Sequence, residues 1–394
     1  MTRTLIVSDL HLGGLSGIDL LRRPELRAAL LDELDGVDRL VLLGDVLELR
    51  HGPPHEALAA ARSFFEDVGR VLGGDRELVV TAGNHDHLMV CTWLDTRALR
   101  EPAPEPLRAE QRLHPAEASP MLARIAQWAA PARVTAAYPG LWVRPDVYAT
   151  HGHFLDAHLT VPTLERIGVG VMGRLLERPP GTLDSVEDYE AVTAPIYAWR
   201  DAITRYAAAG SVLNGLATAR AWRALGGGSQ DGATRPRARG RAQMVRAARV
   251  AASGTAIKRA FPLMVRGLNR AGLGPVNANI SRRELRRGGL RAMGEVAARL
   301  DLGDAYVVFG HTHRAGPFPG DPESEWRGRG GARLVNSGCW TYDAVFLTPT
   351  PGESPYWPGT CVLVEDSGPP LLRRLLLDRS HEDLRPTAAS TATG

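Results

Sequence analysis

Apolar and polar positions follow one another along the chain in blocks that predict strands and helices in turn. Short apolar runs at 3–9, 38–45 and 76–86 have the length and continuity of buried strands, and each ends in a polar loop. The intervening segments, 24–34 and 55–73, repeat apolar residues at helical spacing. Strands of this kind with helices between them predict an α/β fold whose sheet is covered on both faces.

Further along the chain the pattern changes character twice. Residues 97–120 are rich in Pro, Glu and Arg and predict a loop, and a strand that ends in histidine is predicted at 146–153. Helical periodicity then dominates 156–300. Apolar runs predict strands again after that, among them 305–313 and 342–347.

The most economical layout is a single α/β domain with an insertion. We predict a core formed by 1–155 and 300–378, a basic helical insert at 156–299, and a disordered tail at 379–394. The insert begins just after one histidine-bearing strand and ends just before another. It should therefore form a lid over the mouth of any site at those strand ends.

Charge is concentrated in the insert. From Arg220 to Arg291 there are 17 Arg or Lys residues against two acidic residues, a net charge of +15, whereas the whole chain carries +3. The simplest explanation is a solvated helical face, but such asymmetry also fits an anionic partner. Residues 244–274 interleave apolar and basic positions, which suits an anionic lipid surface or a phosphate-rich ligand. Nucleic acid is less favoured, because Phe261 is the only aromatic residue at 223–303 available for base stacking.

Cysteine content and hydropathy give an expected location. The three cysteines, Cys91, Cys339 and Cys361, show no paired spacing, which predicts no disulfide framework and a reducing cytoplasm. The first residues lack the apolar region of a signal peptide, and no run approaches the roughly 18 apolar residues of a membrane span. We expect a cytoplasmic protein, and this location also allows peripheral contact with the inner face of the membrane.

Polar residues with metal-binding chemistry gather at the predicted strand ends. They are Asp9, His11, Asp45, Asn84, His85, Asp86, His151, His153, His311 and His313. Imidazole and carboxylate without thiolate suit Zn, Fe or Mn. One catalytic metal takes about three protein ligands, so the set is large enough for two metals that share a carboxylate. Two metals roughly 3.5–4 Å apart can clamp the attacking and leaving oxygens of a phosphoryl displacement.

The same residues fall into five blocks in a fixed order: D-x-H, G-D, G-N-H-D, a strand-end histidine and G-H-T-H. The blocks are Asp9–His11, Gly44–Asp45, Gly83–Asp86, His151 and Gly310–His313. In block order and strand context the chain resembles the calcineurin-like metallophosphoesterase superfamily over roughly 1–155 and 300–377, but not over the helical insert. The resemblance implies a four-layer α/β/β/α sandwich. It also implies phosphoester hydrolysis by a hydroxide that bridges two divalent ions, for which we favour Mn over Fe or Zn.

The resemblance further implies a role for each residue. Seven residues would hold the metals: Asp9, His11 and His313 the first, Asn84, His151 and His311 the second, and Asp45 both. His85 would face the phosphate and protonate or hydrogen-bond the leaving oxygen. Asp86 would orient His85, a common duty of a carboxylate near a metal site.

Four neighbouring residues each have more than one explanation. Arg50 and His51 could reach a substrate phosphate, although a solvated loop explains them equally well. His153 could contact substrate or hydrogen-bond a metal ligand. Glu48 follows the G-D block where acids are common among the proteins it resembles, and helix-start electrostatics is a sufficient explanation for it.

The expected function is hydrolysis of a small or lipid-linked phosphoester. One alternative is a nuclease or cyclic-nucleotide phosphodiesterase that uses the same metals and the basic insert. A second alternative is a non-catalytic scaffold that keeps the fold without the chemistry. The completeness of the ligand set argues against the scaffold.

Overall fold

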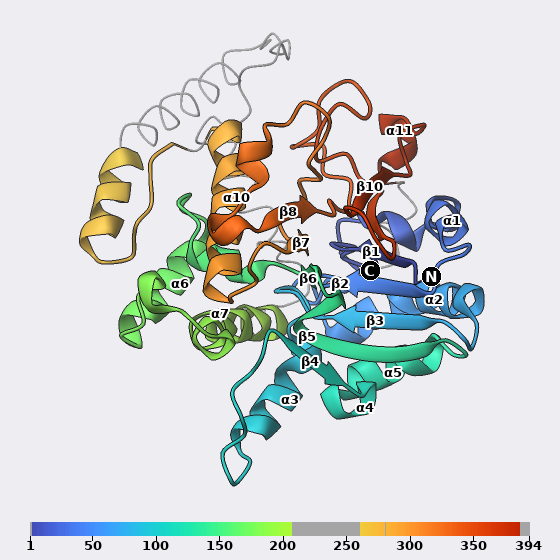
Figure 1. Cartoon of the computed structure of the whole chain (residues 1–394), viewed down its shortest axis with the longest axis horizontal. Coiled ribbons are helices and arrows are strands. Elements are labelled where there is room, and N and C mark those ends of the chain that lie inside the picture. Colours follow the sequence, from blue (N-terminus) through green and yellow to red (C-terminus); the bar gives the residue numbers. More distant parts are fainter. Residues whose placement is uncertain (1, 207–260, 280, 387–394) are drawn as a thin grey trace, which may run out of the picture.

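A computed structural model of the chain describes residues 2–206, 261–279 and 281–386 (Figure 1). These residues form a mixed α/β protein in which helices pack against one large mixed sheet. The α/β class predicted from the sequence is therefore confirmed. Within the described ranges, no helix is both long enough and apolar enough to cross a bilayer.

The sheet has ten strands. They are β1 (Thr4–Val7), β2 (Arg39–Leu43), β3 (Glu77–Thr81), β4 (Glu110–Leu113), β5 (Arg133–Arg144), β6 (Val147–Thr150), β7 (Tyr306–Phe309), β8 (Arg333–Asn336), β9 (Thr360–Val364) and β10 (Leu371–Arg374). Their order is β10-β9-β1-β2-β3-β5-β6-β7-β8, and β4 pairs with β5. Parallel pairing links β1, β2 and β3, the first strand group, and also β6, β7 and β8, the second strand group.

The long strand β5 joins the two strand groups. Its residues 133–137 pair in parallel with β3, and its residues 140–144 pair antiparallel with β6. The two groups consequently run in opposite directions, but both carboxyl ends lie at the middle of β5, where Thr81 pairs with Ala137 and Thr150 with Gly140. The loops that follow the two groups therefore begin near one another, and their side chains meet in one place, as described below.

The α-helices with described bounds cover both ends of the sheet (Figure 1). They are α1 (Pro24–Glu33), α2 (Pro54–Leu72), α3 (Leu88–Ala98), α4 (Pro115–Ala118), α5 (Pro120–Trp128), α6 (Leu164–Leu175), α7 (Val186–Tyr206), α10 (Arg282–Arg299) and α11 (His381–Leu384), and residues 261–270 are also helical. The short 3-10 helices are η1 (Leu20–Arg22), η2 (His153–Ala157), η3 (Pro180–Thr182), η4 (Glu323–Trp326) and η5 (Arg329–Gly331).

Local signals explain many of the helix starts. Proline lies in the first turn of α1, α2, α4 and α5, where its missing N–H would have had no helical partner. Ser119, Thr163 and Ser281 each accept a hydrogen bond from a backbone N–H in the first turn of α5, α6 and α10.

Three apolar clusters stabilise these layers. In the first, α1, α2 and α5 pack against the first strand group. In the second, α6, α7 and α10 pack with the second strand group. The third contains side chains of both strand groups, among them Ile6, Val41 and Val308. Because Leu5 and Val7 belong to the first cluster and Ile6 to the third, β1 is buried on both faces, as its continuous apolar run predicted.

The described part of the insert is helical, in agreement with its sequence. It contains α6, α7, the helical residues 261–270 and α10. Residues 207–260, with much of the basic stretch, lie outside the described residues.

Three local predictions differ from the structure. The predicted loop at 97–120 contains β4 and α4, because β4 gains its backbone partners from β5. Residues 342–347 form a turn in place of the predicted strand. In the tail predicted to be disordered, Ser380 caps α11 with a capping box, so disorder is wrong for residues 381–384, and 387–394 lie outside the described residues.

Candidate metal centre

All seven predicted metal ligands lie in loops that directly follow strands. Asp9 and His11 follow β1, Asp45 follows β2, Asn84 follows β3, His151 follows β6, and His311 and His313 follow β7. Although these strands belong to two groups with opposite directions, the side chains converge at one place. Two sets of three, Asp9, His11 and His313 and also Asp45, His151 and His311, each place their ligand atoms within 4.8 Å of one another.

The backbone of these loops is strained. Five of the seven ligands adopt the left-handed region: Asp9 (φ 56°), His11 (φ 46°), Asp45 (φ 50°), His311 (φ 64°) and His313 (φ 57°). Among the other described non-glycine residues, only Glu177 and Asp301 do so. Each such residue costs roughly 1–2 kcal/mol, and this conformation persists only where the surroundings enforce it. The concentration of strain at one place supports a functional site there.

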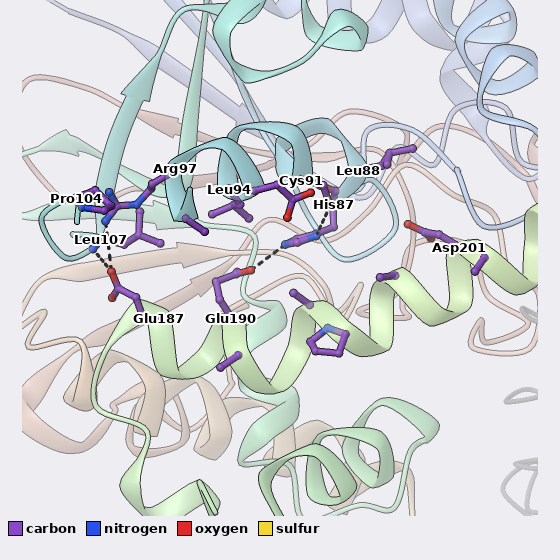
Figure 2. A pocket seen from close by; sticks show the side chains of 17 residues that line it. His87, Leu88, Cys91, Leu94, Arg97, Pro104, Leu107, Glu187, Glu190 and Asp201 are labelled. Atoms are coloured by element: carbon purple, nitrogen blue, oxygen red, sulfur yellow. Dashed lines mark hydrogen bonds and ion pairs between the residues drawn. The ribbon is translucent and has the colours of Figure 1, made fainter. Parts of the chain in front are cut away.

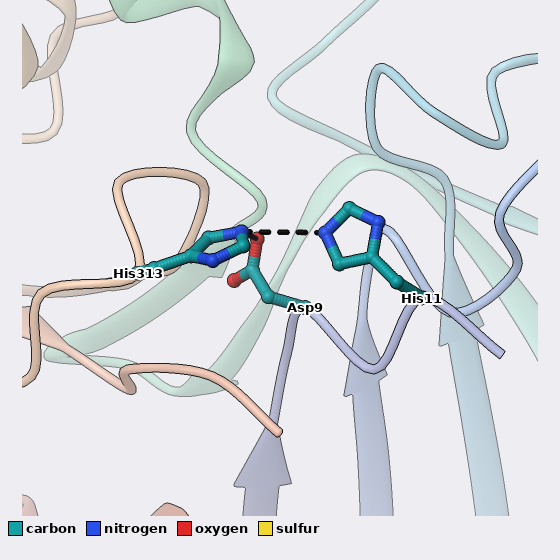
Figure 3. Close-up of side chains that lie close together, drawn as sticks. All are labelled: Asp9, His11 and His313. Carbon is teal, nitrogen blue, oxygen red and sulfur yellow. Dashed lines mark hydrogen bonds and ion pairs between the residues drawn. The ribbon is translucent and has the colours of Figure 1, made fainter. Parts of the chain in front are cut away.

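Asp9, His11 and His313 form the first ligand group (Figure 3). Nε2 of His313 lies 3.2 Å from Oδ1 of Asp9 and 3.3 Å from Nε2 of His11. Nδ1 of His11 donates to Oε2 of Glu48 at 3.0 Å, so in the neutral ring the lone pair is on Nε2, which faces the group. Two imidazole nitrogens and a carboxylate thus face a point that a cation could occupy.

Asp45, Asn84, His151 and His311 form the second ligand group. Nδ1 of His151 donates to the carbonyl of Leu43 at 3.0 Å, which turns Nε2 inward. There Nε2 lies 3.4 Å from Oδ2 of Asp45 and 3.2 Å from Oδ1 of Asn84, and Nδ1 of His311 lies 3.0 Å from the same Oδ1. Acceptors that meet without a proton between them repel one another, and a cation removes that repulsion.

The amide of Asn84 can take either of two orientations. With its oxygen inward, it presents an acceptor to the second ligand group. Turned over, its nitrogen would donate to His151, His311 and Asp45, and its oxygen would accept from Nη1 of Arg50 at 3.0 Å. Only the first orientation presents a lone pair to a cation, so Asn84 fits a metal with its oxygen inward.

Asp45 lies between the two ligand groups. Its Oδ2 is 3.7 Å from Nε2 of His11 in the first group and 3.4 Å from Nε2 of His151 in the second. Its Oδ1 accepts from the backbone N–H of His85 at 2.7 Å, which fixes the carboxylate. The carboxylate of Asp45 therefore lies within 4 Å of an imidazole nitrogen of each ligand group.

Protonated histidines balance the charge of the buried carboxylates at this site. Burial alone would lower the pKa of His151, but the carboxylate of Asp45 raises it to about 9. The pKa of His313 likewise lies well above its usual value, because Asp9 outweighs the effect of burial. Burial would raise the pKa of Asp45, yet His151 and His85 hold it well below the usual range. Metal binding would therefore displace protons from these histidines.

Two carboxylates orient the candidate ligands from outside. Glu48 accepts from His11, as described above, and Oδ1 of Asp156 lies 3.1 Å from Nε2 of His311. Carboxylates in this position fix the orientation of metal-binding imidazoles. Helix-start electrostatics does not explain Glu48, because α2 begins only at Pro54 and its first-turn acid is Glu56. Asp156 was not recognised in the sequence at all.

His85 lies beside the ligands and faces a cavity of about 340 Å³. Its Nδ1 donates to the carboxylate of Glu48, with 2.9 and 2.8 Å to the two oxygens, which leaves Nε2 for a ligand in the cavity. Burial lowers the pKa of His85 to about 4 against the opposing effect of Glu48. His85 is therefore neutral at pH 7.

The structure corrects the expected role of Asp86. Its carboxylate accepts from the backbone N–H groups of Gly83 at 2.7 Å, Val46 at 2.7 Å, and Asp45 and Leu47 at 3.2 Å. Asp86 thus fixes the loop that carries Asp45, and Glu48 orients His85 in its place.

The three expected substrate contacts do not line this cavity. Arg50 is buried behind Asn84, with its guanidinium carbon 5.2 Å from the centre of the Tyr197 ring. His51 lies 3.8 Å from Glu48, and His153 is buried with Nε2 3.4 Å from the hydroxyl of Tyr138. Burial and the neighbouring His151 hold the pKa of His153 well below its usual value. His153 therefore packs behind the site against Tyr138, and no hydrogen bond joins it to a candidate metal ligand among the described residues.

Comparison of the chain with models of protein families and with curated proteins finds no match. The conclusion at this point rests on the site alone. Buried histidine and aspartate groups, oriented by further carboxylates, could hold a metal ion at the strand ends.

Proposed function

We propose that the protein is a dinuclear metal-dependent hydrolase of phosphoesters, of the kind found among calcineurin-like metallophosphoesterases. The observation that carries this proposal is the position of Asp45, whose Oδ2 lies 3.7 Å from His11 in one ligand group and 3.4 Å from His151 in the other. A carboxylate between two nitrogen-rich groups suits two ions that share one ligand, which is the arrangement that clamps a phosphoryl group.

The fold that we propose is a four-layer α/β/β/α sandwich with a helical lid. Support for the inner layers comes from the apolar cluster that contains Ile6 and Val41 of the first strand group and Val308 of the second. Support for the lid comes from the 340 Å³ cavity, because Leu159, Thr163 and Arg200 of the insert line it together with Asp45 and His311 of the core.

In this proposal each ligand group would hold one divalent ion, with Mn favoured over Fe or Zn. When bound, two such ions supply Lewis-acid activation of water and neutralise charge on a phosphoryl group. The chain supplies the orientation: Glu48 fixes His11, Asp156 fixes His311, and the Leu43 carbonyl fixes His151. These bonds set which nitrogen of each ring faces the ions.

His85 would act on the substrate from the side of the cavity. With Nδ1 bonded to Glu48, Nε2 is the nitrogen that can donate to a phosphoryl or leaving oxygen when the ring is protonated. A bound anionic substrate would favour the protonated ring, because it adds negative charge beside a neutral histidine. Leaving-group protonation is therefore coupled to substrate binding.

The walls of the cavity indicate the substrate. Leu155, Leu159, Leu285 and Phe346 make part of the lining apolar, and Arg200 adds a cation, paired with Glu165. We propose a phosphoester with an apolar part, either a small molecule or a lipid-linked one. Contact of the basic insert with an anionic lipid surface remains part of this proposal, as does a cytoplasmic location with peripheral membrane contact.

The decisive experiment measures metal content and phosphoester hydrolysis on the same protein samples. Protein stripped with EDTA and reloaded with Mn²⁺ should bind two ions per chain and hydrolyse members of a phosphoester panel. The panel contains p-nitrophenyl phosphate, bis-p-nitrophenyl phosphate, a lipid-linked pyrophosphate in micelles, a cyclic nucleotide and an oligonucleotide. Asp45→Asn should lower kcat at least about 10²-fold, because a shared ligand loses its charge.

The outcome also separates the rival functions. Preference for the cyclic nucleotide or the oligonucleotide would replace the proposal with a phosphodiesterase or nuclease. Two bound ions without hydrolysis of any panel member would indicate a scaffold.

A further inference from the structure

A second and larger cavity, of about 820 Å³, lies between α3 and α7 (Figure 2). None of the seven candidate metal ligands lines it. Its volume falls within the roughly 300–1,000 Å³ that small-molecule sites occupy. The proposed phosphoester hydrolysis gives this cavity no role.

Small side chains on α7 create the cavity. Ala191, Ala194, Ala198 and Ala202 recur every three or four residues and therefore share one face of the helix, which lines the cavity. Across from them, α3 contributes Leu88 and Leu94 to the lining. The space between the helices is consequently bounded mainly by apolar groups, which suits an apolar ligand.

A chain of three polar side chains crosses this wall. Sγ of Cys91 lies 3.2 Å from Nδ1 of His87, and Nε2 of His87 lies 3.1 Å from Oε2 of Glu190 (Figure 2). Because Nε2 donates to the carboxylate of Glu190, Nδ1 is the nitrogen that can accept the thiol proton. A nucleophile, a base and a group that orients the base are thus in hydrogen-bonding sequence.

Buried partners hold the three side chains Cys91, His87 and Glu190 in place. The hydroxyl of Tyr138 donates to the other oxygen of Glu190, and the side chain of His87 is only 2% exposed. Burial would lower the pKa of His87, but Glu190 raises it to about 10, which stabilises the imidazolium that a thiolate needs as its partner. Cys91 itself is half-buried and within reach of the cavity, whereas Cys339 and Cys361 are buried.

We propose that Cys91 is a nucleophilic thiol that accepts acyl groups from apolar thioesters bound between α3 and α7. The Sγ thiolate of Cys91, whose proton is held on Nδ1 of His87, bonds to the acyl carbon. The bond from the acyl carbon to the leaving sulfur breaks, and that sulfur takes the proton from His87 and departs as a thiol. One thioester is exchanged for another, so the step needs no oxidant or reductant.

The test uses the full-length protein and the octanoyl thioester of N-acetylcysteamine at pH 7, followed by intact mass and peptide mapping. The wild type should gain one octanoyl group, on Cys91, with Cys339 and Cys361 unmodified as internal controls. His87→Gln should slow the labelling roughly 10²-fold, the usual contribution of a positioned base. Glu190→Gln, which keeps an acceptor for Nε2 but removes the charge, should slow it less, and it serves as the test if His87→Gln does not fold.

A substitution in the cavity wall distinguishes binding of the acyl group in the cavity from the reactivity of the Cys91 thiol. Ala194→Trp should fill the space and slow octanoyl transfer at least tenfold, while the small reagent iodoacetamide still alkylates Cys91. Asp45→Asn should leave the labelling unchanged, so the result is independent of the proposed hydrolase. The proposal is overturned if Cys91 reacts at the same rate in the wild type, in His87→Gln and in Glu190→Gln, or if Ala194→Trp leaves the octanoyl rate unaltered.

Discussion

Nδ1 of His85 lies 2.9 and 2.8 Å from the two carboxylate oxygens of Glu48. The same carboxylate accepts from Nδ1 of His11 at 3.0 Å, and it is itself only 3% exposed. One buried side chain therefore orients both a candidate metal ligand and the candidate acid–base residue. Its position couples the two parts of the proposed site.

Glu48→Gln should lower kcat and metal affinity together. Glutamine carries no charge, and the amide nitrogen that replaces one oxygen cannot accept the bonds that Oε1 accepts from Nδ1 of His85 and the backbone N–H of Arg50. His11 and His85 therefore both lose part of their orientation. Loss of such a partner usually costs 10–100-fold in metal affinity or activity. Steady-state kinetics with the preferred phosphoester and a Mn²⁺ titration should both move by about that factor.

The matched control is Glu117→Gln, an exposed position in the first turn of α4. It should leave both quantities within experimental error. If Glu48→Gln keeps wild-type activity and metal affinity, Glu48 does not orient these histidines.

The candidate ligands could be found from the sequence because they follow strands. Asp9, Asp45, Asn84 and His151 each come shortly after an apolar run, and carboxyl ends of strands are where loops bring such residues together. Glu48 and Asp156 have no such marker. Their function depends on burial and on loop conformation, and neither quantity is visible in residue spacing. The misassigned role of Asp86 has the same cause.

Some strands of the fold could likewise be predicted from the sequence, and others could not. β1, β2 and β3 were predictable because both of their faces are apolar. β4 was not, since its sequence, EQRL, is polar and it is a strand only through its pairing with β5. The register of β5, whose two halves pair with β3 and β6 so that both carboxyl ends lie at its middle, is a tertiary property that the pattern of hydrophobic residues does not specify.

Gly310→Ala should damage the metal centre more than the fold. A Cβ at this position would lie 2.3 Å from Oδ2 of Asp9 and 2.3 Å from Oγ of Ser8, so the Asp9 carboxylate would have to move. We expect at least about a tenfold loss of metal affinity, alongside an overpacking cost of roughly 1–3 kcal/mol. Gly181→Ala is the matched control, because nothing lies within 4 Å of its Cβ. Calorimetric Mn²⁺ titration of both variants measures the difference, and equal affinities would show that Asp9 is not a ligand.

Metal removal should lower the melting temperature. An ion that binds only the folded state stabilises it by about 2.7 kcal/mol at one hundred times its Kd. Thermal unfolding after EDTA treatment, and again after addition of Mn²⁺, measures the effect. Ca²⁺ should restore less, since four of the seven ligands are histidines and Ca²⁺ prefers oxygen. Equal rescue by Ca²⁺ would contradict a nitrogen-rich site.

The His87–Glu190 pair predicts a loss of stability at alkaline pH. Burial opposes protonation of His87, but Glu190 raises its pKa to about 10 from the ordinary 6.5. The folded protein therefore keeps a proton that the unfolded chain loses above about 6.5. The stabilisation is complete below that pH and is lost as the pH rises toward 10, with a slope of up to about 1.4 kcal/mol per pH unit. Urea unfolding of the wild type and of Glu190→Gln at pH 7.5, 8.5 and 9.5 isolates this contribution, because all other titrating groups are shared. The wild type should lose its advantage step by step across this range, and a constant difference between the two proteins would show that His87 does not hold the proton.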